Sequence, residues 1–187
     1  MKRVAIVTMM LQLGVAAVYA QETHVKMTFS GTAGSSTVDL QQPDTSNGED
    51  NFAGNGTLGS FTYRDVRAIA NSPTSSSTCS GPNQLFFSES AGVGVFRFQD
   101  GSLLKVHQTQ GGDCIDFAAQ KAHCTQTLQI DWGTGRFKNA HGGNLMFTET
   151  TVPLLGLDNP TFFAATGQFA GTVLGVAMEE EPPSERQ

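Results

Sequence analysis

The sequence predicts an all-β protein, a single antiparallel barrel of about eight strands, with a β-sandwich as the alternative. Three observations support this fold class. Apolar and polar residues alternate with a period of two along most of the chain, as they do in half-buried strands. Turn-forming segments separate these runs, and Gly alone occurs 21 times among 187 residues. Long amphipathic helices are not indicated, and at most one helical turn is expected, within 113–123.

The alternating runs place the strands in order along the chain. The first is expected over 24–30, where Val25, Met27 and Phe29 alternate with polar residues. Residues 31–56 are rich in Gly, Ser, Thr, Asn and Asp, so we expect a long loop there. The remaining strands are expected at 58–69, 84–88, 92–99, 102–109, 125–132, 144–152 and 161–173. A closed barrel is favoured over a sandwich because closure leaves no unpaired edge strand.

Two further local patterns bear on these strands. In 58–69, Phe61, Tyr63 and Ile69 share one parity, and Asp65 and Arg67 interrupt it. The pair Asp100-Gly101 predicts a tight hairpin turn, because Gly adopts positive φ without penalty. A proline-containing loop is expected over 71–83.

The N-terminus has the layout of a cleaved secretory signal. Lys2 and Arg3 precede an apolar stretch, and Val18 and Ala20 put small residues at the third and first positions before a cut ahead of Gln21. We therefore expect a signal peptide over 1–20, a barrel domain over 21–177 and a disordered acidic tail over 178–187. The expected location is secreted or periplasmic, with no membrane segment after cleavage.

Charge excludes some partner classes. Lys2 and Arg3 account for two of the 11 basic residues, so nine remain against 17 acidic ones, a net charge of −8 at pH 7. Phosphate backbones and anionic membranes repel such a surface, so neither nucleic acid nor a membrane is an expected partner. No cofactor is expected either.

Export changes the interpretation of the three cysteines, because an oxidising compartment favours disulfides. Cys114 and Cys124 flank a short loop between two strand-like runs, so we favour a bond between them, with Cys79 bonded to either one as the rival. Asp113, Asp116 and His123 lie beside them and suggest a zinc site. Their spacing matches no zinc signature, and no metal is predicted.

A resemblance to a known family lies in 133–147, GTGRFKNAHGGNLMF. This segment resembles the GTG-x-F-x-x-A-x-G segment of the allene oxide cyclase-like barrels, which include the dirigent proteins and some bacterial cyclases. Residues 162–173, FFAATGQFAGTV, resemble the closing strand of secreted bacterial proteins of unknown function. The resemblance implies an eight-stranded antiparallel barrel with a central cavity. It carries over no catalytic residues.

Glu149 is the candidate catalytic residue. It shares a strand face with Leu145 and Phe147, so it becomes a buried acid with a raised pKa if that face points into the barrel. The alternatives are that the opposite face, with Met146, Thr148 and Thr150, points inward, or that Glu149 lies at the solvent-exposed end of the strand. Elsewhere, Arg97 is expected on the outside.

The sequence holds 13 phenylalanines. Neighbours such as Phe162 and Phe163 must point to opposite faces of a strand. Inward members would line an apolar ligand cavity, and outward members would form an interface between copies of the chain. The cavity candidates are Phe96, Phe98, Phe147 and Phe163.

These features support three hypotheses for function. The favoured one is a secreted, non-catalytic barrel that binds a small apolar ligand or another chain. The second is a cyclase or isomerase of the allene oxide cyclase-like type, with Glu149 as acid and base, because folding a substrate into a reactive shape needs few chemical groups. The third is a structural component of the envelope or matrix that assembles as a homo-oligomer.

Overall fold

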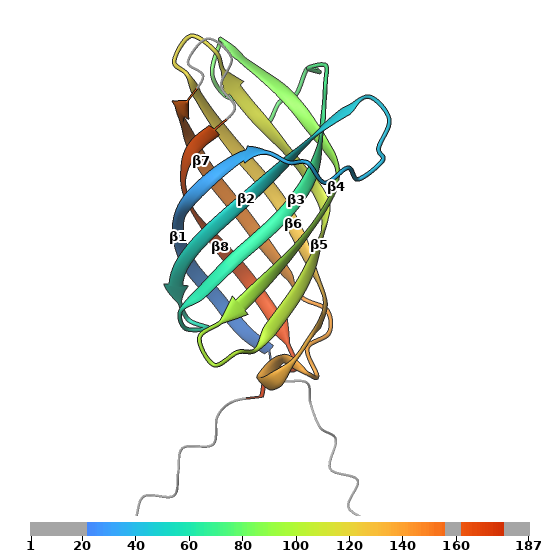
Figure 1. The fold of residues 1–187 in the computed structure, drawn as a ribbon, viewed down its shortest axis with the longest axis vertical. Coiled ribbons are helices and arrows are strands. Elements are labelled where there is room, and N and C mark those ends of the chain that lie inside the picture. Colours follow the sequence, from blue (N-terminus) through green and yellow to red (C-terminus); the bar gives the residue numbers. More distant parts are fainter. Residues whose placement is uncertain (1–21, 156–161, 178–187) are drawn as a thin grey trace, which may run out of the picture.

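The computed structural model describes residues 22–155 and 162–177, which form one closed antiparallel barrel. Each strand pairs with its neighbours in sequence, and the last strand pairs with the first (Figure 1). The predicted all-β class and barrel closure are confirmed. The predicted signal peptide, 1–20, and acidic tail, 178–187, lie outside the described residues.

The strands are β1 (Glu22–Ser35), β2 (Thr45–Gly56), β3 (Phe61–Ala70), β4 (Gln84–Phe98), β5 (Leu103–Asp116), β6 (Lys121–Gly133), β7 (Asn144–Leu155) and β8 (Phe162–Leu174). Gly101, between β4 and β5, has a φ of +82°, as the predicted hairpin turn requires. Within the described residues the only helical segment is a single 3-10 turn, η1 (Gly135–Phe137), so the helical turn considered for 113–123 does not form. No helix in this part of the chain is long and apolar enough to cross a membrane.

Two strand predictions need correction, although the number of strands agrees. The expected loop 31–56 contains the end of β1 and all of β2. The expected strands 84–88 and 92–99 form the single strand β4, whose pairing with β3 shifts register between Ala68 and Ile69. Glycine and asparagine lower the intrinsic strand preference of β2. Pairing with β1 and β3 on its two sides nevertheless supplies its backbone hydrogen bonds.

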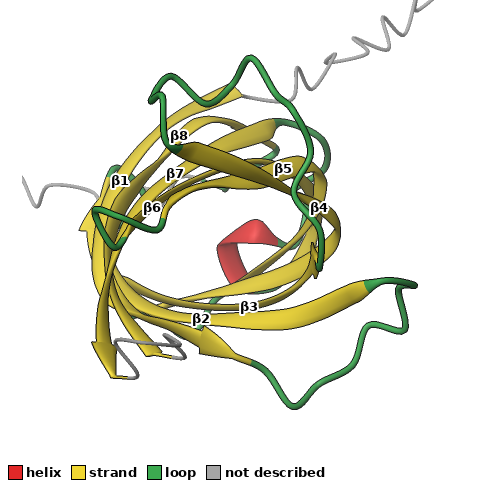
Figure 2. Ribbon diagram, turned by 90° about the horizontal axis from the view of Figure 1, so that it is seen from above, coloured by secondary structure: helices red, strands yellow, loops and turns green. Residues whose placement is uncertain are grey.

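The two ends of the barrel differ. The connections after β2, β4 and β6 lie at one end, which we call the closed end, together with η1 (Figure 1). The connections after β1, β3 and β5 lie at the opposite, open end. A view down the barrel shows η1 crossing its far mouth (Figure 2). Phe137 of η1 is fully buried, so its ring seals the closed end.

Aromatic side chains fill the half of the barrel next to the closed end. The rings of Phe29 and Phe52 stack with centroids 4.3 Å apart, and Phe169 packs against Phe96 at 4.8 Å. Tyr63 lies at the upper edge of this cluster, 4.5 Å from Phe96. A Cβ on Gly94 would lie 2.3 Å from the Tyr63 hydroxyl, so only glycine leaves room for that ring. The aromatic core thus ends at about the middle of the barrel.

The predicted disulfide is wrong in its pairing. Cys79 bonds Cys114, and Cys124 is a free, buried cysteine. On β5 and β6, Asp113 pairs with Cys124, whereas Cys114 pairs with His123. Because alternate residues of a strand point to opposite faces, Cys124 points into the barrel and Cys114 points out. Cys114 therefore meets Cys79 in the outer loop 71–83.

We expect Cys79→Ala to lower the free energy of unfolding by about 3–4 kcal/mol, the loop-closure value for a sequence separation of 35 residues. Urea unfolding without reductant measures this loss. Cys124→Ala is the matched control, which keeps the disulfide and loses less. A peptide map of the oxidised protein that joined Cys114 to Cys124 would contradict the assigned pairing.

Candidate functional site

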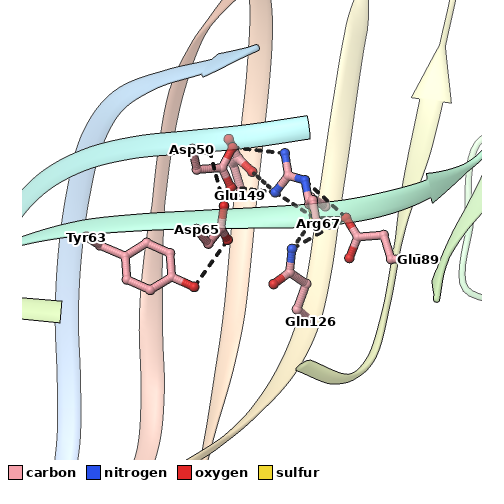
Figure 3. Close-up of polar contacts among 8 residues, drawn as sticks. Asp50, Tyr63, Asp65, Arg67, Glu89, Gln126 and Glu149 are labelled. Atoms are coloured by element: carbon pink, nitrogen blue, oxygen red, sulfur yellow. Dashed lines mark hydrogen bonds and ion pairs between the residues drawn. The ribbon is translucent and has the colours of Figure 1, made fainter. Parts of the chain in front are cut away.

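A belt of buried polar side chains lies directly above the aromatic core. Every strand from β2 to β7 contributes to it, and the side chains point inward (Figure 3). Its members are Asp50, Asp65, Arg67, Glu89, Asp113, Cys124, Gln126 and Glu149. We call this set the polar belt. It places five carboxyl groups around one guanidinium group.

Arg67 on β3 holds the belt together. Its Nη2 donates to Asp50 Oδ1 at 2.9 Å, and its Nη1 donates to the other oxygen of the same carboxylate, so this pair is bidentate. Its Nε lies 3.3 Å from Glu89 Oε1, and its Nη1 lies 3.6 Å from Glu149 Oε2. The guanidinium therefore faces three carboxylates but forms a close, two-point contact with only Asp50.

Asp65 connects the belt to the aromatic core. Its Oδ2 accepts a hydrogen bond from the Tyr63 hydroxyl at 3.2 Å, and its Oδ1 accepts from the backbone N–H of Asp50 at 3.1 Å. These contacts fix the floor of the belt against the rings below. The polar belt is thus built on a rigid base rather than on loops.

Burial dominates the acid–base behaviour of the belt. It raises the pKa of Glu149 to about 7 against the lowering effect of Arg67, and Asp113 raises it further. Burial raises the pKa of Glu89 to about 8, again assisted by Asp113 and opposed by Arg67. Burial also raises the pKa values of Asp50 and Asp65. The belt therefore holds exchangeable protons near neutral pH.

A cavity of about 640 Å³, which we call the cup, occupies the open half of the barrel. Arg67, Asp113 and Glu149 of the polar belt line its floor. Its walls are largely apolar and include Ala33, Ile69, Phe87, Ile115, Ala122 and Phe163. A few charged side chains, among them Asp116 and Lys121, lie higher on the lining, toward the turn between β5 and β6. The cup thus combines a charged floor with largely apolar walls.

The predicted site residues divide between the cup and the core. Glu149 points inward and is 1% exposed, whereas Met146 and Thr150 of β7 are exposed. Phe163 lines the cup. Phe96, Phe98 and Phe147 are buried in the aromatic core below it, so these three are not wall residues as hypothesised. Elsewhere, Arg97 is exposed, as predicted.

Sequence reasoning missed most of the polar belt. Asp50 lay in the segment expected to be a loop, and Asp65 and Arg67 were treated as interruptions of a strand. A signal was present, because Asp65 and Arg67 share the parity of Phe61 and Tyr63 and so continue the inward face. The contacts among Asp50, Arg67 and Glu149 join three separate strands, which no local pattern reveals.

One group of side chains within the belt has metal-ligand chemistry. Donor atoms of Glu89, Asp113 and Cys124 lie within 4.8 Å of one another. Arg67 already places its positive charge there, with Nη1 4.0 Å from Cys124 Sγ and Nε 3.3 Å from Glu89. Burial also raises the pKa of the Cys124 thiol, which disfavours the thiolate that a metal needs. The guanidinium thus takes the place that a cation would fill.

Comparison of the chain with protein-family models, with curated proteins and with solved structures gave no match. The arguments on function below therefore depend on the geometry of the cup and of the polar belt.

The raised pKa values predict that stability falls as pH rises. A carboxyl whose pKa is higher in the folded state stabilises the fold below its unfolded value, and this contribution is lost as pH rises through the folded value. For Glu149 the window runs from 4.5 to about 7. We expect Glu149→Gln to gain on the order of 2–3 kcal/mol relative to the wild type between pH 4.5 and 8.

Urea unfolding across this pH range measures the difference. Glu22→Gln is the control, since Glu22 is exposed on β1 and its curve should run parallel to that of the wild type. Parallel curves for Glu149→Gln as well would show that Glu149 ionises as an ordinary solvated acid.

Proposed function

We propose that this protein binds a small, largely apolar molecule in the cup. The observation that carries the proposal is the cavity of about 640 Å³, which falls in the range of small-molecule sites. Its lining combines apolar side chains with polar groups, and the buried charged groups among them lie at the floor.

Access to the cup is from one side. Phe137 and the aromatic core fill the closed half of the barrel, so a ligand enters past the loops of the open end. Burying the apolar part of a ligand against Ile69, Ile115 and Phe163 contributes about 25 cal/mol per Å² of surface removed from water. The polar belt then fixes which end of the ligand points downward.

The signal-like N-terminus, the disulfide and the family resemblance support the same function. The signal-like segment 1–20 suggests a location outside the cytoplasm, and the disulfide between Cys79 and Cys114 suits an oxidising compartment. The resemblance of 133–147 to the allene oxide cyclase-like barrels supports a binding cavity, since it implies a barrel with a central cavity.

Filling the cup should weaken binding. Ala122→Trp puts an indole into the cavity, and we expect it to weaken the binding of Nile red, a neutral apolar dye, about tenfold or more. Fluorescence titration measures the affinity. The matched control is Ala53→Trp, which makes the same change at an exposed position of β2. Absence of saturable binding to the wild type, or equal affinities in the two variants, would refute the proposal.

A second candidate function is proton transfer on a bound molecule, as in an isomerase or cyclase. The specific observation is that Glu149 lies on the cup floor with a pKa of about 7. A carboxyl that titrates near the working pH can both accept and donate a proton, which is what general acid–base catalysis requires. The apolar walls would keep water away from the reacting carbon.

A generic substrate tests this candidate without knowledge of the natural one. In the elimination of nitrobenzisoxazole, a base removes the ring C–H proton, the N–O bond breaks and a coloured cyanonitrophenolate leaves. We expect the wild-type rate to rise with pH as Glu149 ionises, with its midpoint near 7. Glu149→Gln should lose about 100-fold, and Glu22→Gln should lose nothing. Equal rates for all three proteins would exclude Glu149 as a base.

A further inference from the structure

The floor of the cup contains hydrogen-bond acceptors that no group in the described part of the chain satisfies. Both carboxylate oxygens of Glu149 are buried without a hydrogen-bond partner in the described part of the chain, and so is Glu89 Oε2. Glu149 also lines the cup. Buried polar atoms are normally paired, because an unpaired one costs about 1–3 kcal/mol. The lone acceptors therefore point to an occupant that donates hydrogen bonds.

Arg67 does not meet this need. Each of its two terminal nitrogens donates to Asp50, and Nη1 forms only an ion pair with Glu149, because it lies 3.6 Å from Oε2, which is longer than a hydrogen bond. The other side-chain donors in the belt are Gln126 and Cys124, and both face Glu89. Gln126 Nε2 lies 3.4 Å and Cys124 Sγ lies 3.7 Å from Glu89 Oε1. The oxygens of Glu149 are therefore left without a hydrogen-bond donor among the described residues, at the floor of the cup.

The charge of the floor favours a positive donor over a neutral one. The groups that face Glu149 across the belt are Asp50 on β2, Asp65 and Arg67 on β3, Glu89 on β4, Asp113 on β5 and Cys124 on β6. Five carboxyl groups, counting Glu149 itself, thus stand against one guanidinium. A carboxylate or phosphate on a ligand would meet like charge in a poorly screened site.

We propose that the cup selects a cationic amphiphile, an inference that rests on the binding function proposed above. Its ammonium head donates to Glu149 and lies beside Asp113, and its apolar part lies between Ile69, Ile115 and Phe163. The head replaces protons that the belt carries when no cation is bound, because a nearby positive charge favours ionised carboxyl groups. Binding is therefore coupled to proton release near neutral pH, and affinity for the amine rises with pH through the ionisation of Glu149.

Four probes with the same decyl chain test the head group: decylamine, decyltrimethylammonium, decanol and decanoate. Each displaces Nile red from the full protein, below its micelle concentration and with a chelator present so that no divalent cation neutralises the floor. Alkylamines stay protonated at neutral pH, as lysine does with a pKa of about 10.4. We expect decylamine to bind about tenfold or more tightly than decanol, and decanoate to bind most weakly. Decyltrimethylammonium, which carries charge but no N–H, should fall between decylamine and decanol.

Variants of the floor residues test where the head group of the ligand binds. Glu149→Gln should remove most of the gap between decylamine and decanol and leave the affinity for decanol within about twofold. Asp113→Asn provides a second test if Glu149→Gln does not fold by near-ultraviolet circular dichroism, and it should narrow the same gap. Glu22→Gln, exposed on β1, should keep the gap. Titration of the wild type with decylamine in two buffers of different ionisation enthalpy should show protons released at pH 7.

The outcomes separate this proposal from the one on which it rests. If decanoate or decanol binds as tightly as decylamine, the proposed preference for a cationic head group is wrong and the binding function stands. If the gap persists in Glu149→Gln and in Asp113→Asn, the head does not lie at the floor, and the proposal fails. If neither Nile red nor any decyl probe binds the wild type, the proposed binding function itself fails.

Discussion

The ion cluster around Arg67 determines how the inside of this barrel is divided. One guanidinium lies among five carboxyl groups with little solvent, and a buried charge persists only where partners compensate it. The bidentate pair with Asp50 supplies that compensation and joins β2 to β3 through side chains. Below the cluster, rings pack to the closed end. Above it the interior stays open, so the same charged layer ends the core and begins the cup.

The sequence predicts those parts of this arrangement that depend on local patterns, and not those that depend on contacts between distant strands. Alternation is local, and it was sufficient for the class, the antiparallel closure and most strands. It failed at β2, where Gly, Ser, Asn and Asp resemble a loop although the inward positions carry Asp50 and Phe52. It failed also for the cysteines, because the register between β5 and β6 decides that Cys114 and Cys124 face opposite sides. A shift of one residue in register moves every side chain of a strand to the other face, and the pairing of β5 with β6 contains two such irregularities.

The site was predictable to a smaller degree, for the same reason. Glu149 could be found because its strand alternates cleanly, and the open question was only which face points inward. Asp65 and Arg67 carried the same parity as their aromatic neighbours, but charges on a core face usually argue against burial. Their burial makes sense only when β2, β3 and β7 are brought together. Functional layers are where local rules for a core are expected to fail.

The pairing of β1 with β8 has a consequence for how the molecule can be mounted. Glu22 of β1 and Leu174 of β8 are register partners at the closed end of the barrel, opposite the open end (Figure 1). A linker attached before β1 or after β8 therefore begins at the closed end. Molecules immobilised on a surface through such a linker would all orient the open end away from the surface. The entrance to the cup would then stay accessible.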